Sequence, residues 1–200
     1  DYTVQFANYM SPFPNLSYFE ENYTTFKANN VKGLFVQGYA DVPGDFSELR
    51  QYLLAKLLWD ASIDVKATTA DFLRGFYGKA ASEIENYLKL LSENQQKSKA
   101  YLDIYSGPVQ NRTTYLTPEA MNQYDKFLEK AWQAVDEDKT IQKRVEKLRL
   151  ALEYTYFEQA KFYGADAHGL FITNSNGEKI IKEGLNERVQ RFSQECKNDG

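Results

Sequence analysis

Cysteine and histidine are almost absent from this chain of 200 residues, which contains one of each, Cys196 and His168. A single cysteine cannot form an intramolecular disulfide, and a single histidine leaves no cluster with the spacing of zinc or iron ligands. We therefore expect no metal site and no cofactor. The chain is nevertheless long enough to bury a hydrophobic core without disulfides or metals.

Long apolar runs and an excess of basic residues are missing as well. No apolar stretch approaches the roughly 20 residues that cross a bilayer, and no signal-peptide pattern precedes Asp1. The 28 acidic and 24 basic residues give a formal net charge of -4 and are interspersed along the chain. We therefore expect no membrane span and no nucleic-acid partner. Because Asp1 opens directly into a β-rich segment without a methionine, we expect the upstream part of the same protein as a partner.

Aromatic residues, in contrast, make up 15% of the chain, with 15 Tyr, 13 Phe and 2 Trp. One interpretation is that the rings build the core and the seams between helices, since aromatic side chains dominate burial. The alternative is that some of them stack on sugars, whose pyranose rings present apolar C–H faces. Both interpretations stay open at the level of the sequence.

The first part of the chain has the pattern of a strand, a helix and a second strand. Residues 2–10 are rich in β-formers, and a helix ending near Ala28 follows after Pro12 and Pro14. Residues 31–39 form a second short apolar run. Such a unit joins parallel strands by a right-handed crossover, and two strands alone do not make a sheet that is stable by itself. We therefore expect a βαβ unit with partners elsewhere.

From Asp45 onward the pattern is helical. Asp45 and Glu48 have the spacing of a capping box, and apolar residues follow at helical spacing up to Trp59. We expect this helix to be buried on more than one side, between the βαβ unit and the helix containing Phe72 and Phe76, which makes Trp59 a buried anchor and not a platform for sugars. A small hairpin or a loop is predicted between Gly169 and Ile181. Further helices are predicted over residues 62–76, 79–102, 118–135, 140–164 and 183–197.

These patterns predict a mainly α fold with a small α/β portion. Residues 1–44 form the strand-helix-strand portion, and residues 45–200 form a helical domain. His168 follows the end of a predicted helix and is interpreted as a loop or capping residue, with a catalytic base as the alternative.

Candidate binding residues lie where the two predicted strands end. In parallel α/β folds, ligands gather at the carboxyl ends of the strands. Those positions carry hydrogen-bonding and aromatic side chains, and we predict a substrate-binding set of Asn8, Tyr9, Gln37, Tyr39 and Asp41. In the alternative interpretation Asn8 and Gln37 satisfy loop backbone, and Asp41 is a solvated turn residue.

A pair of catalytic carboxylates is not visible in the sequence. A glycosidase needs two carboxyl groups roughly 5 to 10 Å apart, flanking the scissile bond. Only Asp41 and Asp45 lie near the predicted strand ends, and Asp45 is already interpreted as a helix cap. No nucleophile elbow, P-loop or dinucleotide fingerprint is present. We therefore predict no catalytic residue, and no turnover by this chain alone.

Two runs resemble the domain of unknown function 4838 family: residues 44–60 (GDFSELRQYLLAKLLWD) and residues 71–81 (DFLRGFYGKAA). Shorter motifs add to the resemblance, which extends over most of residues 1–160: Asn8-Tyr9 before Pro12-Phe13-Pro14-Asn15, Gly33-Leu34-Phe35 before Gln37-Gly38, and Arg144-Val145-Glu146 before Arg149. Proteins of this family look like α-glucuronidase-type glycoside hydrolases from bacterial polysaccharide utilisation, with a (β/α)8-type barrel followed by helices.

The resemblance implies that residues 2–39 are the terminal βαβ unit of such a barrel, and that the principal catalytic acids lie upstream. It also implies a carbohydrate ligand and a periplasmic or extracellular location. The family pattern commonly has an acidic residue before the Gln-Gly pair, where this chain has Val36. The departure favours a protein that binds a glycan without cleaving it, or one that depends on another residue.

Three functions remain open from the sequence. The chain belongs to a glycoside hydrolase and supplies one wall of its site, or it is a non-catalytic carbohydrate-binding or scaffold module. The third is a helical protein-interaction domain, suggested by aromatic residues on the long helices such as Trp132 and Phe162.

Overall fold

The computed structural model describes residues 3–37 and 44–199, which are mainly helical with one small antiparallel sheet. The predicted fold class is confirmed at this level. The helices are α1 (Phe19–Ala28), α2 (Ser47–Trp59), α3 (Val65–Tyr77), α4 (Ala81–Ser98), α5 (Pro118–Gln133), α6 (Lys139–Tyr163) and α7 (Leu185–Asp199), and the strands are β1 (Phe171–Thr173) and β2 (Lys179–Ile181). Short 3-10 helices cover Leu16–Tyr18, Gly78–Ala80 and Gln110–Thr113.

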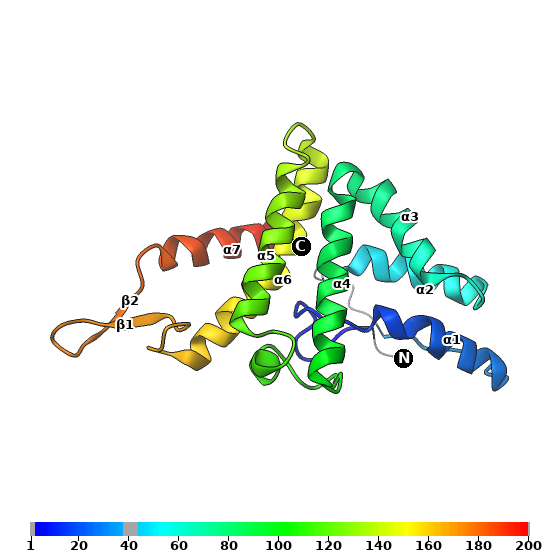
Figure 1. Cartoon of the computed structure of the whole chain (residues 1–200), viewed down its shortest axis with the longest axis horizontal. Helices are drawn as coiled ribbons and strands as arrows, with labels where there is room; N and C mark the ends of the chain where they lie inside the picture. Colours follow the sequence, from blue (N-terminus) through cyan, green and yellow to red (C-terminus); the bar gives the residue numbers. More distant parts are fainter. Residues whose placement is uncertain (1–2, 38–43, 200) are drawn as a thin grey trace.

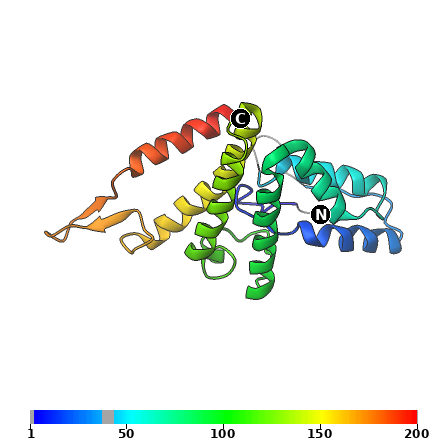
Figure 2. The ribbon, with the colours of Figure 1, turned by 45° about the horizontal axis from the view of Figure 1, so that its top comes forward.

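The long helices α4, α5 and α6 pack against one another in sequence order. Helices α1, α2 and α3 lie on one side of the α4–α5–α6 group, next to α4. Helix α7 and the β1–β2 hairpin lie on the opposite side, next to α6, and the hairpin extends away from the helices (Figure 1). The rotated view in Figure 2 shows the same separation. Among the described residues, no helix has both the length and the apolar character needed to cross a membrane.

The core is built largely from aromatic and leucine side chains. Tyr87 of α4 is one of its buried rings, stacked on Phe46 at 5.9 Å and edge-on to Tyr124 of α5 at 5.4 Å. Helix α1 contributes Phe19 and Tyr23 to the same buried cluster. The core interpretation of the aromatic content therefore holds for these rings. The division of the chain at residue 44 stays a prediction.

Local capping signals place several helix starts. The Thr117 side chain accepts a hydrogen bond from Ala120 N at 3.2 Å, and Pro118 occupies the first helical position of α5. Asp64 accepts from Ala67 N at 2.8 Å at the start of α3. These caps satisfy backbone N–H groups that the first helical turn leaves unpaired.

The capping box predicted at Asp45 and Glu48 is wrong. Helix α2 begins at Ser47, and its N-cap is Phe46, which has a left-handed backbone with φ 51° and makes no side-chain cap. The Asp45 carboxylate instead accepts a hydrogen bond from Phe13 N at 3.1 Å, 32 positions earlier in the chain. The carboxylate that the local pattern assigned to the helix start is therefore used in a tertiary contact with Phe13.

The strands predicted over residues 2–10 and 31–39 are not formed in the described part of these segments, residues 3–10 and 31–37. The two segments meet where the N–H and the hydroxyl of Thr3 donate to Gln37 O at 3.1 and 3.2 Å. Extended segments become a stable sheet only with further strands beside them. The described residues supply no such neighbour here.

The sheet that does form is the hairpin predicted after Gly169. Strands β1 and β2 pair antiparallel, with Phe171 opposite Ile181 and Thr173 opposite Lys179. Its turn contains Gly177 at φ 81°, a conformation that glycine adopts without steric cost.

Trp59 is not buried, contrary to prediction: its side chain is 93% exposed. Leu49, Leu53 and Leu57 form the buried stripe of α2 at a spacing of four residues. Trp59 follows Leu57 by two residues, which places it about 200° around the helix, on the opposite face. The helix is therefore covered on one side at this point, and Trp59 is not an anchor.

Candidate functional site

A buried polar network joins the N-terminal segment to α2. The Arg50 guanidinium, 3% exposed, donates through Nη2 to Asp45 Oδ2 at 2.9 Å and to Phe13 O at 2.7 Å. Its Nε donates to Asp45 O at 2.6 Å, and its Nη1 donates to Asn15 Oδ1. The contacts connect residues 13–15 with residues 45–50, which belong to two of the motifs that carry the family resemblance.

Burial perturbs both members of this ion pair. Loss of water raises the pKa of Asp45 above its usual value, against the opposing effects of Arg50 and of the Phe13 N–H. The same loss of water lowers the pKa of Arg50, although Asp45 acts in the other direction. Burial therefore disfavours the charged form of both groups, whereas their mutual attraction favours it, as in other buried salt bridges. With Asp45 only 4% exposed, the network orders the backbone and does not present an acid to a substrate.

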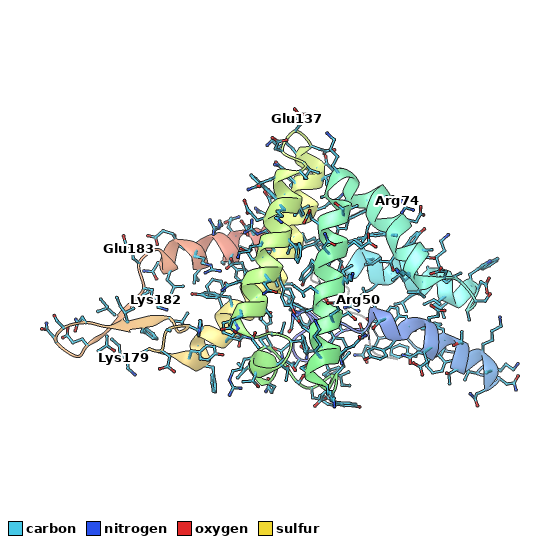
Figure 3. The ribbon with its side chains drawn as sticks, viewed as in Figure 1. Arg50, Arg74, Glu137, Lys179, Lys182 and Glu183 are labelled. Carbon is cyan, nitrogen blue, oxygen red and sulfur yellow. The ribbon has the colours of Figure 1, made fainter. Side chains whose placement is uncertain are left out.

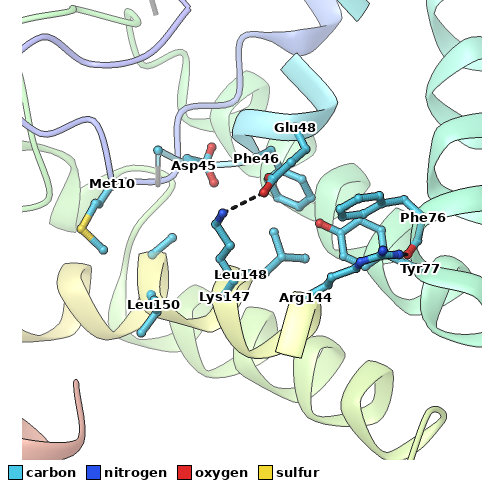
Figure 4. A pocket seen from close by; sticks show the side chains of 12 residues that line it. Met10, Asp45, Phe46, Glu48, Phe76, Tyr77, Arg144, Lys147, Leu148 and Leu150 are labelled. Carbon is cyan, nitrogen blue, oxygen red and sulfur yellow. Dashed lines mark hydrogen bonds and ion pairs between the residues drawn. The ribbon is translucent and has the colours of Figure 1, made fainter. Parts of the chain in front are cut away.

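A small cavity lies beside the network (Figure 4). Glu48 Oε1 accepts from Lys147 Nζ at 2.8 Å along its wall, and the Arg144 guanidinium lies 4.1 Å from the centre of the Phe76 ring. Burial acts to raise the pKa of Glu48, but the hydrogen bond and charge of Lys147, together with hydrogen bonds from the Glu48 backbone and Ser47, lower the pKa. The cavity has a volume of about 20 Å³. That space holds a water molecule and no sugar ring.

A much larger groove runs past the other side of the network. Its volume is about 650 Å³, within the range of about 300 to 1,000 Å³ typical of ligand sites. It lies between the segment that leads into α1, the start of α3 and one face of α4. The lining residues are Phe13, Pro14, Leu16, Ser17, Glu20, Asp45, Arg50, Val65, Lys66, Thr69, Glu85, Asn86, Leu88, Lys89, Leu91, Ser92, Glu93 and Gln96.

The groove combines a small apolar floor with many hydrogen-bonding side chains. Phe13 and Leu91 are buried at its base, and Asp45 and Arg50 support it from behind. Its exposed rim carries carboxylates, amides, hydroxyls and the ammonium groups of Lys66 and Lys89. Such a surface can bind a ligand with many hydroxyl groups, because each hydroxyl both donates and accepts.

Asn8, one of the predicted binding residues, is committed to structural contacts. Its Nδ2 donates to Ser106 O at 3.1 Å, and its Oδ1 accepts from Tyr154 OH at 2.6 Å. The half-buried side chain thereby ties the N-terminal segment to α6 and to the loop before α5. This placement agrees with the alternative interpretation, in which Asn8 satisfies loop backbone.

The other predicted binding residues are not brought together at the groove. Tyr9 is half-buried, and its carbonyl accepts from Asp45 N at 3.1 Å. Gln37 is half-buried, and its carbonyl accepts from Thr3. Tyr39 and Asp41 lie outside the described residues.

Sequence reasoning missed the groove for an identifiable reason. The groove-lining polar residues of α4 follow the ordinary pattern of a solvated helix face. They recur every three to four residues at Asn86, Lys89, Glu93 and Gln96, and Glu85 lies beside the first of them. Only tertiary packing shows that another segment lies opposite this face.

His168, the alternative catalytic base, lies in a turn after α6 and is exposed, with its ring 5.6 Å from that of Tyr163. The prediction of a loop position is confirmed.

The first part of the chain, which includes most of the groove, matches the model of a known family. The family model described as Domain of unknown function (DUF4838) matches residues 1–89. The resemblance to that family is confirmed for these residues, and its predicted extension to residue 160 stays a prediction. Comparisons with curated proteins and with solved structures give no match. The residues that line the groove fall within the matched part, except Leu91, Ser92, Glu93 and Gln96.

Proposed function

We propose that this chain is the carbohydrate-binding, non-catalytic part of a glycoside-hydrolase-like protein, and that the glycan binds in the groove between α1, α3 and α4. The observation that carries the proposal is the groove itself. It is large enough for sugar units, its rim is polar, and most of its lining residues lie within the part that matches the family. In this proposal the parent protein acts on extracellular or periplasmic polysaccharide, and its catalytic acids lie upstream.

The side chains of the rim support binding of a hydroxyl-rich ligand. Asn86 and Gln96 offer amide groups that donate and accept at fixed geometry, and Glu85 offers a charged acceptor. Lys66 and Lys89 add two ammonium donors, each of which can form a charge-assisted hydrogen bond with a carboxylate of a glycan. Both lysines are exposed and have no ion-pair partner among the described residues.

The spacing of the carboxylates on α4 supports binding over cleavage. The two glutamates that α4 contributes to the groove, Glu85 and Glu93, stand more than two turns apart, a rise of about 12 Å along the helix. Glycosidic cleavage uses carboxyl groups about 5 to 10 Å apart. Asp45 is enclosed by Arg50 and Phe13 and does not reach the rim.

The experiment is a titration of the chain with neutral and uronic-acid-capped oligosaccharides, followed by amide NMR shifts and calorimetry. We expect the shifted amides to cluster on residues 13–20, 65–69 and 85–96. The double variant Lys66→Ala/Lys89→Ala should weaken binding of acidic glycans about tenfold or more, since a charge-assisted hydrogen bond contributes ~1.5–3 kcal/mol. The matched control is Lys79→Ala, an exposed lysine outside the groove, which should leave the affinity unchanged.

Two outcomes would contradict the proposal. One is that glycans shift no amide of the groove, or that the double variant binds them as the control does. The other is reproducible turnover of aryl glycosides that Asp41→Asn abolishes, which would make the chain catalytic and place its site at the predicted strand ends.

A further inference from the structure

The β1–β2 hairpin has an exposed edge with a defined hydrogen-bonding pattern. It projects from the helical body beyond α6 and α7, as Figures 1 and 2 show. Isoleucines on both strands are unusually accessible, with Ile172 at 45%, Ile180 at 43% and Ile181 at 49% exposure. A free strand edge with apolar side chains is a template for pairing with another strand.

The register identifies which backbone groups face outward. Asn174 N donates to Glu178 O, and Lys182 N donates to Leu170 O. Hydrogen-bonded pairs alternate with non-hydrogen-bonded pairs in an antiparallel ladder, so Glu178, Ile180 and Lys182 direct their N–H and C=O groups toward the neighbouring strand. The corresponding groups of Lys179 and Ile181 therefore point away from the hairpin.

The two edges of the hairpin are not equivalent. On β1, the outward N–H of Phe171 donates to Gly164 O at 3.0 Å, so the chain itself covers part of that edge. On β2, the outward groups of Lys179 and Ile181 have no partner elsewhere among the described residues. The open edge is therefore that of β2.

We propose that the chain self-associates through this edge. Strand β2 pairs antiparallel with β2 of a second copy, with Ile180 on the two-fold axis, and the two hairpins form a four-stranded sheet. In this register Lys179 lies opposite Ile181 of the second copy, and both residues present outward backbone groups. Four backbone hydrogen bonds form across the axis, two from each copy.

Charge complementarity favours a second copy of this chain as the partner of the β2 edge, and favours this register of pairing. With Ile180 on the axis, Glu178 faces Lys182 of the second copy, and the symmetry repeats the pair. Opposite charges in cross-strand positions stabilise a sheet, whereas like charges destabilise it. Each group keeps capacity for the new contact: Glu178 Oε2 accepts from Asn174, which leaves Oε1, and Lys182 Nζ donates one bond to Ala167 O at 2.8 Å.

The neighbouring registers are less suitable. In one of them, Ile180 of one copy lies opposite Ile181 of the other. The N–H and C=O groups of Ile180 then point into its own hairpin and cannot bind those of Ile181, and Lys179 lies opposite Lys182 of the other copy. Centring the pair on Ile181 would require Glu183 to continue the strand, but Glu183 lies in the turn before α7. Figure 3 shows Lys179, Lys182 and Glu183 at this end of the molecule, away from Arg50 and the core.

The paired segment is only a few residues long and buries little surface, so we expect a weak dimer whose population rises with the concentration of the chain. Stable interfaces bury about 1,200–2,000 Å², and smaller ones are typical of transient association. The matching experiment is sedimentation velocity on the whole chain from about 10 µM to about 1 mM, where such an interface becomes populated. We expect a reversible shift from monomer to dimer over this range.

Charge reversal tests the register. Lys182→Glu and Glu178→Lys should each shift the dimer constant about tenfold or more toward monomer, and the double variant should restore it because the pair is reversed on both copies. Glu183→Lys, outside the pairing, is the control and should dimerise as the native chain does. Ile181→Pro removes an outward N–H and should also abolish the dimer while β1 and β2 remain paired.

Three results would overturn the proposal: a native chain that stays monomeric at about 1 mM, single reversals that dimerise normally, or a dimer that survives Ile181→Pro. Equal melting temperatures of the variants would show that the helical body is intact in each case. The test is independent of the glycan groove, which lies on the other side of the helical body.

Discussion

Replacing Arg50 with methionine tests whether the buried network orders the N-terminal segment on α2. The variant keeps an unbranched apolar chain in a well-packed position but removes the guanidinium. Asp45 would then retain Phe13 N as a donor and lose the buried cation with which it is paired. The carbonyl groups of Asp45 and Phe13 and the Asn15 side chain would lose donors at the same time.

The magnitude follows from the burial of both partners. Asp45 and Arg50 are each 3% exposed at the side chain, so the remaining carboxylate cannot be solvated. Removing one partner of a buried pair costs about 3–5 kcal/mol. For a chain of this length, at ~2–4 °C per kcal/mol, the melting temperature should fall by roughly 6–20 °C.

The loss should depend on pH with a defined sign. Burial raises the pKa of Asp45, and without Arg50 the pKa in the folded variant rises further. A carboxyl group whose folded pKa lies above its unfolded value destabilises the fold fully above the folded pKa. The penalty disappears as the pH falls toward the unfolded value of 3.8. The difference in melting temperature between variant and native chain should therefore narrow as the pH is lowered toward that value.

Arg149→Met is the control, because Arg149 binds Asp125 and Glu129 at 2.9 and 2.7 Å but is 32% exposed. Exposed pairs contribute about 0–1 kcal/mol, so this variant should melt close to the native chain. Thermal melting by circular dichroism from acid to neutral pH measures both variants. Equal melting temperatures for Arg50→Met and Arg149→Met at neutral pH would refute the reasoning.

Three further substitutions probe exposure and buried hydroxyl groups. Trp59→Ala should move the melting temperature by no more than about 2 °C, since changes at exposed positions stay within ~0.5 kcal/mol. A large drop would mean that Trp59 is covered. A loss of glycan affinity at unchanged stability would make Trp59 a binding residue. Tyr87→Phe should leave the free energy of unfolding unchanged or raise it, because the buried Tyr87 hydroxyl has no hydrogen-bond partner among the described residues. Tyr124→Phe should lower it by about 1–3 kcal/mol, because the Tyr124 hydroxyl donates to Tyr115 O and accepts from Asn94, both at 2.8 Å. Urea titration measures this pair, and the reverse order of the two variants would contradict the assignment.

The helical part of the fold is predictable because its signals are local. Thr117 and Asp64 cap two helices that the sequence predicts, since a cap needs only the next three residues. Asp45 has the same local signal, but its carboxylate binds Phe13 and Arg50. A capping pattern does not show whether a distant cation will compete for the side chain.

Strands and sites depend on contacts that the sequence does not display. Residues 3–10 have strand composition, yet strand formation requires neighbours that the described residues lack. The binding set predicted at the strand ends depends on the same missing sheet, which is why Asn8 and Gln37 appear in structural contacts instead. The groove needs α1 and α4 to come together across more than 50 residues, and no periodicity in α4 indicates that approach.

The left-handed backbone of Phe46 limits how this part of the sequence can diverge. A β-branched residue is strained at φ 51°, so valine, isoleucine and threonine are disfavoured there. Glycine suits the backbone but leaves empty the place of the ring that stacks on Tyr87. The position thus faces two selective demands that point to different residue types, and an unbranched aromatic side chain meets both at the cost of backbone strain. Replacements that survive in related sequences should be other flat rings, or should change together with Tyr87.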